Sequence, residues 1–213
     1  MKTIILNLIL LTLSINIFSQ PNIDKKAKSI LDDVSAKTKA YKTISIDFTY
    51  TMQNQAKKIN QSKKGSLLIK GNKYVMKMAG QTVIYDGNAI YTYIKDANEV
   101  QINTPTEESI NPTQLLTTYD KDYKPKFIKE ENINGIVLQV IDLSPTKQSK
   151  NIARVRLKIN KNKKQVESST LYDKDGSTYT YNVDKFITDI PINDSEFIFK
   201  KSDFPGAEII DMR

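Results

Sequence analysis

The chain has 213 residues, long enough for one domain or two small ones, and 32 Lys and Arg against 24 Asp and Glu give it a formal net charge of +8. It contains no Cys, His or Trp. These absences exclude a Ser-His-Asp triad, a cysteine nucleophile, a disulfide framework and any zinc or haem site with His or Cys ligands.

Residues 1–19 have the layout of a secretory signal peptide. Lys2 supplies the positive start, the stretch 4–18 is mainly apolar, Ser19 is small and Pro21 breaks the helix. The alternative is a membrane anchor, but about 15 helical residues reach only about 22 Å against a hydrocarbon layer of about 30 Å. We therefore predict that residues 1–19 are removed and that residues 20–213 form a single domain in the periplasm.

One amphipathic helix is predicted at the start of that domain. Pro21 and Asn22 are suited to begin and cap it, and it is expected to end near Thr38 after about four turns. Lysines and aspartates occupy one face. The other face is an apolar stripe of Ile23, Ala27, Ile30, Leu31 and Val34.

After the helix, apolar and polar residues alternate with a period of two, which is typical of half-buried strands. Turn residues separate the candidate strands so closely that antiparallel hairpins are the expected connections. A stretch with two prolines, 104–124, breaks the pattern and predicts short helices at 112–118 and 119–123. The predicted strands are 44–52, 64–70, 73–79, 81–86, 89–95, 98–103, 125–131, 135–143, 152–160, 164–172, 177–184 and 196–200.

A mainly β fold follows, with about 11 strands in one antiparallel sheet that is large enough to curl. A curled sheet has a concave face, and one-sided helices of the predicted kind would cover it with their apolar stripes.

Two concentrations of basic residues stand out. One is Lys57, Lys58, Lys63 and Lys64, and the other runs from Lys147 to Lys164 with Arg154 and Arg156 inside a predicted strand. One interpretation is an ordinary solvated strand face. The other is a patch for anionic lipid headgroups or an acidic protein partner. Nucleic acid is not an expected partner, because no recognition motif accompanies the charge.

The apolar side of the first strands also has two interpretations. Ile44, Ile46, Phe48, Tyr50 and Met52 alternate with polar residues, and Tyr74, Met76 and Met78 follow in a later strand. These residues would serve as plain core. Thioethers and aromatic rings equally suit a surface that accepts varied apolar ligands.

The order of these features resembles the periplasmic outer-membrane lipoprotein carrier family (LolA-like), across about 22–213. The landmarks are spread along the chain and each is short. They are the opening helix with Ile30-Leu31-Asp32-Asp33-Val34-Ser35, the strand Ile44–Tyr50, the stretch Lys64–Lys70 with Lys73-Tyr74, Asp86-Gly87 before Ile90-Tyr91-Thr92-Tyr93, Asn98-Glu99-Val100, Asn111–Leu116, Leu143-Ser144-Pro145 and Phe197-Ile198-Phe199.

The resemblance implies an unclosed antiparallel β half-barrel whose concave face is covered by the N-terminal helix and a short helical insertion. It implies a carrier, not an enzyme, that holds the acyl chains of lipoproteins in a hydrophobic cavity. It takes them from an inner-membrane ABC transporter to an outer-membrane acceptor, as a monomer and without metal or cofactor.

On this basis we predict which side chains hold lipid. The cavity would be lined by Ile44, Ile46, Phe48, Tyr50, Leu67, Ile69, Tyr74, Met76 and Met78. The lid would be formed by Ile23, Ala27, Ile30, Leu31, Val34, Leu115 and Leu116.

One departure from the family stands before the third strand. Many relatives have Lys-Arg-Pro there, with an arginine that latches the lid, and this chain has Lys70-Gly71-Asn72. A lid that closes by packing alone, or a different cargo, is then expected. The alternatives are a carrier or sensor of another lipid or glycolipid, a hydrolase that uses Ser, Tyr, Lys and carboxylates, and a surface protein with a solid core.

Overall fold

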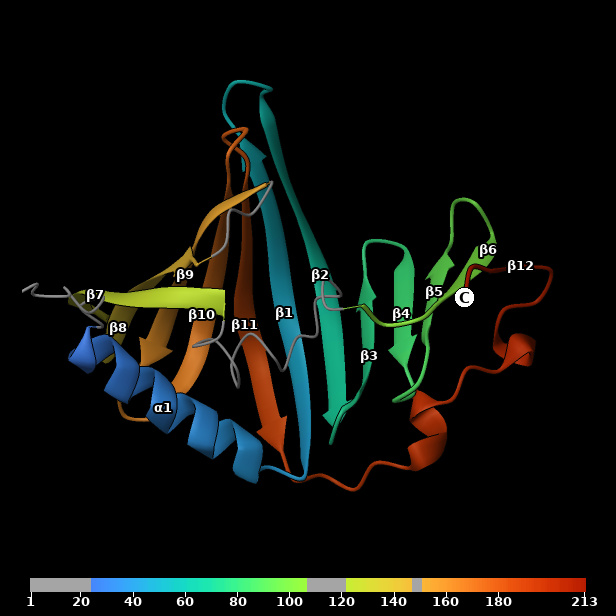
Figure 1. The fold of residues 1–213 in the computed structure, drawn as a ribbon, viewed down its shortest axis with the longest axis horizontal. Helices are drawn as coiled ribbons and strands as arrows, with labels where there is room; N and C mark the ends of the chain where they lie inside the picture. The colour runs from blue at the N-terminus through green and yellow to red at the C-terminus, as the bar shows by residue number, and fades with distance from the viewer. Residues whose placement is uncertain (1–23, 107–121, 147–150) are drawn as a thin grey trace, which may run out of the picture.

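The computed structural model describes residues 24–106, 122–146 and 151–213 (Figure 1). Its described strands form a single 12-stranded sheet in the order β12-β6-β5-β4-β3-β2-β1-β11-β10-β9-β8-β7. Their bounds are β1 Thr43–Asn54, β2 Ile59–Lys70, β3 Lys73–Met78, β4 Gln81–Tyr85, β5 Ile90–Ile94, β6 Glu99–Asn103, β7 Tyr123–Ile133, β8 Ile136–Pro145, β9 Ile152–Asn160, β10 Gln165–Asp173, β11 Thr178–Thr188 and β12 Glu208–Asp211.

The topology is two runs of hairpins that meet in the middle of the sheet. β1 to β6 follow one another outward, β7 to β11 return inward, and β11 pairs with β1. All neighbours are antiparallel except β12, which runs parallel to β6. β7 and β12 are the two edges, so the sheet is unclosed, as predicted, and Figure 1 shows that it is curved.

Helix α1 (Lys25–Ala40) crosses the β7–β10 half of the concave face (Figure 1). Its buried residues Ala27, Leu31 and Val34 pack with side chains of β8 and β9, among them Ile141 and Leu157. All five are at most 2% exposed. The predicted amphipathic helix is therefore confirmed, and its apolar stripe forms the main core of this half.

The C-terminal segment covers the opposite face of β3 to β6. It contains two short 3-10 turns, η1 (Asp194–Phe197) and η2 (Lys201–Asp203). Phe197 is fully buried with Val75 and Ile84, and Phe199 stacks on Tyr91 with ring centroids 4.8 Å apart. The C-terminal segment thus buries the apolar residues on the convex side of these strands.

Several predicted boundaries were wrong. The helix begins at Lys25, not at the Pro21-Asn22 pair, because Asp24 is its N-cap and accepts a hydrogen bond from the Ala27 N–H at 3.0 Å. β2 begins at residue 59 instead of 64, since it pairs along its whole length with β1. The predicted strand 196–200 is instead turn η1 and its continuation, and the short strand β12 was missed.

Other predictions fall on residues that the structure does not describe. They are the signal peptide 1–19, the helix 112–118 with Leu115 and Leu116, and Ile23. The helix predicted for 119–123 lies mostly outside the described residues, and Tyr123 begins β7. Within the described ranges, no helix is both long enough and apolar enough to cross a membrane.

Candidate functional site

The concave face of β1, β2 and β3 carries one continuous apolar surface. Backbone pairing sets Ile46 opposite Leu67, and Leu67 opposite Met76. Residues directly opposite one another share a face of the sheet, so these three side chains form one cross-strand row. The neighbouring cross-strand rows extend this apolar surface along the three strands.

All nine residues predicted to line the cavity belong to this surface. Five are buried, namely Ile44, Phe48, Leu67, Ile69 and Tyr74, and four are partly buried against them, namely Ile46, Tyr50, Met76 and Met78. The sheet register therefore brings the predicted set together on one face. Whether the set holds lipid remains a prediction.

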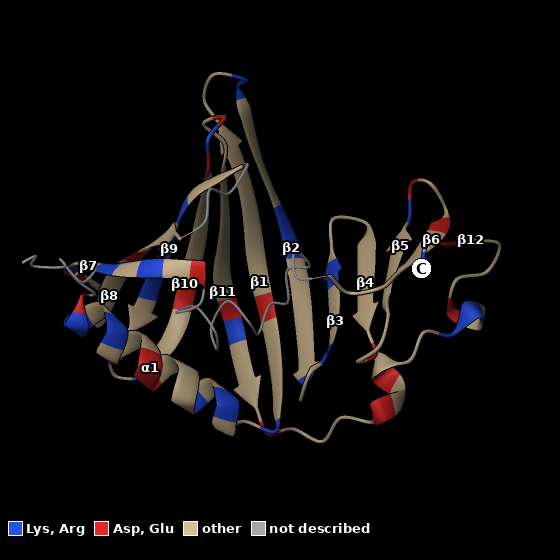
Figure 2. Ribbon diagram, in the orientation of Figure 1, with Lys and Arg blue, Asp and Glu red and all other residues tan. Residues whose placement is uncertain are grey.

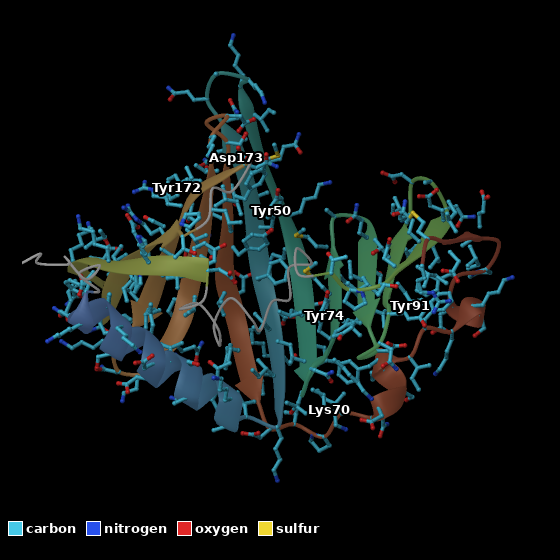
Figure 3. All side chains as sticks on the ribbon, in the orientation of Figure 1. Tyr50, Lys70, Tyr74, Tyr91, Tyr172 and Asp173 are labelled. Atoms are coloured by element: carbon cyan, nitrogen blue, oxygen red, sulfur yellow. The ribbon has the colours of Figure 1, made fainter. Side chains whose placement is uncertain are left out.

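A cavity of about 330 Å³ lies on this surface, beside the C-terminal end of α1. Six of the nine predicted residues line it: Ile44, Ile46, Phe48, Leu67, Ile69 and Met76. Tyr50, Tyr74 and Met78 lie in the same apolar cluster outside its walls. Tyr50 stands toward the β1–β2 hairpin and Tyr74 lies lower, on β3 (Figure 3).

The opposite wall of the cavity was not predicted. It comes from β9, β10 and β11 and from the end of α1, which approach β1 only because β11 pairs with it. The alternation of Tyr179, Tyr181 and Val183 in β11 was the available signal. The added lining residues are Thr38, Tyr41, Leu157, Lys164, Gln165, Val166, Ser169, Leu171, Tyr181, Val183 and Phe186.

The predicted lid residues of α1 lie elsewhere. Ala27, Leu31 and Val34 are buried in the core against β8 and β9, with Ile30 packed beside them, and none of the four lines the cavity. The helix contributes to the cavity through Thr38 near its end. Ile23, Leu115 and Leu116 lie outside the described residues, so their lid role stays a prediction.

Polar groups in the cavity wall are few. Burial, with the neighbouring Tyr50 and Tyr179, raises the pKa of Tyr181, so its ring stays neutral. The hydroxyl oxygen of Ser169 is buried and has no hydrogen-bond partner among the described residues. The ammonium of Lys164 lies 2.9 Å from a carboxylate oxygen of Asp33 on α1. Such a wall, mainly apolar, suits an apolar ligand.

The basic concentration on β9 is largely compensated by acidic neighbours. Arg154 and Arg156 both bond Asp142, at 2.9 and 2.7 Å, and Lys158 lies 2.7 Å from Glu131. Burial raises the pKa of Asp142, but the two guanidinium groups outweigh it and the net shift is downward. For the described part of this patch the solvated-strand interpretation is favoured.

Lys70 belongs to the stretch Lys70-Gly71-Asn72, which departs from the family pattern. Its side chain contacts the C-terminal segment. Its ammonium donates to the Ile192 carbonyl at 2.8 Å and pairs with Asp194 at 2.6 Å. It lies at the lower end of β2, beside the C-terminal segment (Figure 3). In this structure the residue ties that segment to the sheet.

The fold is similar to that of solved structures. A conserved protein of Thermus thermophilus superposes with a TM-score of 0.58 at 11% identity, over 88% of this chain and 99% of its own. A LolA superfamily protein of Nitrosomonas europaea gives 0.45 at 14% identity, over 81% and 97%. LprF of Mycobacterium bovis gives 0.46 at 14% identity, over 80% and 96%. No curated protein matches the sequence.

Family membership comes from the sequence profile of the outer membrane lipoprotein carrier protein LolA, which matches residues 39–200. The match spans β1 to β11 and includes the strands that build the cavity. With an unclosed antiparallel sheet and a helix on its concave face, the chain belongs to the LolA family of outer membrane lipoprotein carrier proteins.

Proposed function

We propose that this protein is a periplasmic carrier that binds the acyl chains of lipoproteins in the cavity on its concave face. The observation that carries the proposal is the 330 Å³ apolar cavity, since a solid core of the same residues would leave no space there. The family and the predicted signal peptide support the periplasmic location.

Energetics explain why a carrier is needed. A triacylated lipoprotein buries on the order of 45 methylenes in a membrane, and at about 0.8 kcal/mol each its release into water costs about 35 kcal/mol. A carrier therefore has to offer comparable apolar surface. The energy for extraction has to come from elsewhere, and an inner-membrane ABC transporter is the proposed donor, with an outer-membrane acceptor at the other end.

The size of the cavity bears on how cargo enters. Its volume lies at the lower end of the range of about 300–1,000 Å³ that is typical of small-molecule sites. Three acyl chains need more room, so loading widens the cavity. Met76, Tyr41 and Phe186 are the wall residues suited to move, because they are only partly buried at the edge of the apolar cluster.

The proposal is tested with Ile46→Asp and Phe48→Asp, which place a charge in the cavity wall. Thr51→Asp, on the other face of the same strand, is the matched control, since Thr51 bonds Ser62 and points away from the cavity. Binding of a hydrophobic dye and mass spectrometry of co-purified lipid are the measurements. We expect the two cavity variants to lose dye and lipid, and Thr51→Asp to retain both.

The outcomes separate the competing functions. If the cavity variants fold and still carry acylated lipoprotein, the lipid site has been assigned to the wrong residues. A co-purified glycolipid or free lipid would instead favour a carrier or sensor of another lipid. Turnover in a broad hydrolase assay would contradict the carrier role and favour an enzyme.

A further inference from the structure

The face of the sheet opposite the cavity carries a shallow groove of about 450 Å³ beside the β3–β4 hairpin. Pairing places Ser66 opposite Lys77, Lys77 opposite Thr82, and Thr82 opposite Tyr93, so these four form one cross-strand row. Tyr93 packs on Phe204 of the C-terminal segment, with ring centroids 4.7 Å apart. The row therefore lies on the convex face, away from the lipid cavity.

The groove exists because the turn at its centre lacks long side chains. Ala79 and Gly80 both have positive φ, at 55° and 80°, and form the tight connection between β3 and β4. The N–H of Lys95 donates to the Gly80 carbonyl at 3.0 Å and brings the β5–β6 hairpin alongside. Lys64 on β2 borders the same groove from the other side.

Three exposed ammonium groups thus surround one hollow, from Lys64, Lys77 and Lys95. None of the three makes an ion pair with any residue that the structure describes, in contrast to the paired lysine and arginines of β9. Two carboxylates lie in the adjoining strands: Asp47 stands opposite Ser66 and also opposite Lys185, and Asp184 accepts from the hydroxyl of Thr49, which stands opposite Lys64. Figure 2 shows Lys and Arg as blue segments partway along β2 and near the upper end of β3.

The chemistry of the groove points to one class of partner. Its lining offers the hydroxyls of Ser66 and Thr82, while the Tyr93 hydroxyl donates to Asn98, and ammonium and hydroxyl groups are the donors that phosphate oxygens accept from. We propose that this lysine groove docks the protein on the phosphate headgroups of an anionic phospholipid surface. Lysines attract such a surface through its negative potential and do so reversibly. The groove therefore serves a contact that must form and break repeatedly.

This inference goes beyond cargo binding and is independent of it, since the groove and the cavity lie on opposite faces of the sheet. A compact anionic headgroup is favoured over an acidic protein because the three ammonium groups surround a hollow with hydroxyls in its lining, not an extended charged strip. The acidic protein is one outcome of the test.

The experiment is sedimentation of the cargo-free protein with vesicles. The vesicles contain phosphatidylcholine with roughly 30 mol% phosphatidylglycerol, and pure phosphatidylcholine vesicles are the reference. The groove variant is Lys64→Gln/Lys77→Gln/Lys95→Gln. The matched control is Lys25→Gln/Lys39→Gln/Lys42→Gln, which removes the same charge from exposed lysines on and after α1. Dye binding in the cavity is measured on the same samples.

We expect the unmodified protein to bind the anionic vesicles and to release them as salt screens the attraction. The groove variant should bind on the order of a hundredfold more weakly, because each lysine near the surface contributes about fivefold. The control should bind within a few fold of the unmodified protein, and all three should bind dye equally.

Equal losses in the two variants would overturn the proposal, since net charge alone would then explain the binding. No preference of the unmodified protein for anionic vesicles would also overturn it. Groove-dependent binding to polyglutamate but not to vesicles would replace the lipid surface by an acidic protein. Loss of dye binding in every protein would instead contradict the cavity and leave the vesicle result standing.

Discussion

The carboxylate of Asp24 joins the start of helix α1 to the edge strand β7. One oxygen accepts from the Ala27 N–H at 3.0 Å and the other from the Phe127 N–H at 2.8 Å. Phe127 stands at a register shift before Lys129, and the ammonium of Lys26 lies 3.6 Å from its ring centroid. A single side chain thereby caps the helix and pairs a backbone donor of the outermost strand.

Removing this carboxylate should loosen the attachment of the helix. Asp24→Ala loses both hydrogen bonds, and we expect the free energy of unfolding to fall by about 2 kcal/mol. Asp33→Ala is the control, since its ion pair with Lys164 is exposed and contributes less than about 1 kcal/mol. Denaturant titration measures both. Equal stability of the two variants would mean that the Asp24 contacts contribute no more than the exposed Asp33–Lys164 pair.

The same carboxylate should make stability depend on pH. The Ala27 and Phe127 N–H groups hold the pKa of Asp24 below its ordinary value of 3.8. The native state therefore favours the charged form more than the unfolded state does, so the stabilisation is complete above about pH 5 and is lost as pH falls below 3.8. The stability difference between the unmodified protein and Asp24→Asn should shrink over that range. A difference that stays constant down to about pH 3 would contradict this assignment.

Gly65 should control the position of an aromatic ring in the cavity wall. A Cβ at this residue would lie 2.6 Å from Phe48 Cε2 and 2.9 Å from the Lys77 carbonyl oxygen. Gly65→Ala is therefore expected to cost about 1–3 kcal/mol and to push the ring into the cavity, with weaker dye binding. Adding Phe48→Leu to Gly65→Ala should restore part of the lost stability and part of the lost dye binding. If the double variant shows no recovery, the clash with the ring is not the cause.

Ser169 should behave as an unsatisfied polar group. Its buried hydroxyl oxygen has no described partner, so Ser169→Ala removes a desolvation cost without removing a bond. We expect thermal unfolding to show unchanged stability or a gain of up to about 1 kcal/mol. Ser168→Ala, at the buried neighbour on the other face, is the comparison. A clear loss of stability on Ser169→Ala would reveal a partner for the hydroxyl.

Lys70 should protect the C-terminal segment from local opening. Lys70→Gln loses the pair with Asp194 and weakens the bond to the Ile192 carbonyl. Because the pair is exposed, global stability should change little. Amide exchange around η1 should nevertheless accelerate several-fold. Lys73→Gln is the control, and equal exchange in the two variants would argue against a tie at Lys70.

Periodicity along the chain was enough to predict the helix and most strands. The alternation from Ile44 to Met52 and the spacing of Ala27, Leu31 and Val34 each reflect burial of one face, which local sequence records directly. The polar start of β2 hid the strand, because its pairing with β1 and not its composition keeps it extended. Phe197–Phe199 resembled a strand, yet the aromatic side chains fill the outer face of the sheet from an irregular segment.

The sequence by itself determined that each strand has one apolar and one polar side, since a period of two assigns the side chains within a strand to alternate sides. The register then placed Ile46, Leu67 and Met76 on the same face of the sheet. Only the tertiary structure decided what lies across from them. The pairing of β11 with β1 brings Tyr181 and Phe186 to the cavity from a distant part of the chain. Pairing among β7, β8 and β9 likewise neutralises one basic run, and pairing among β2 to β5 gathers three separated lysines around one groove, because charge compensation depends on neighbours in space that the order of residues does not record.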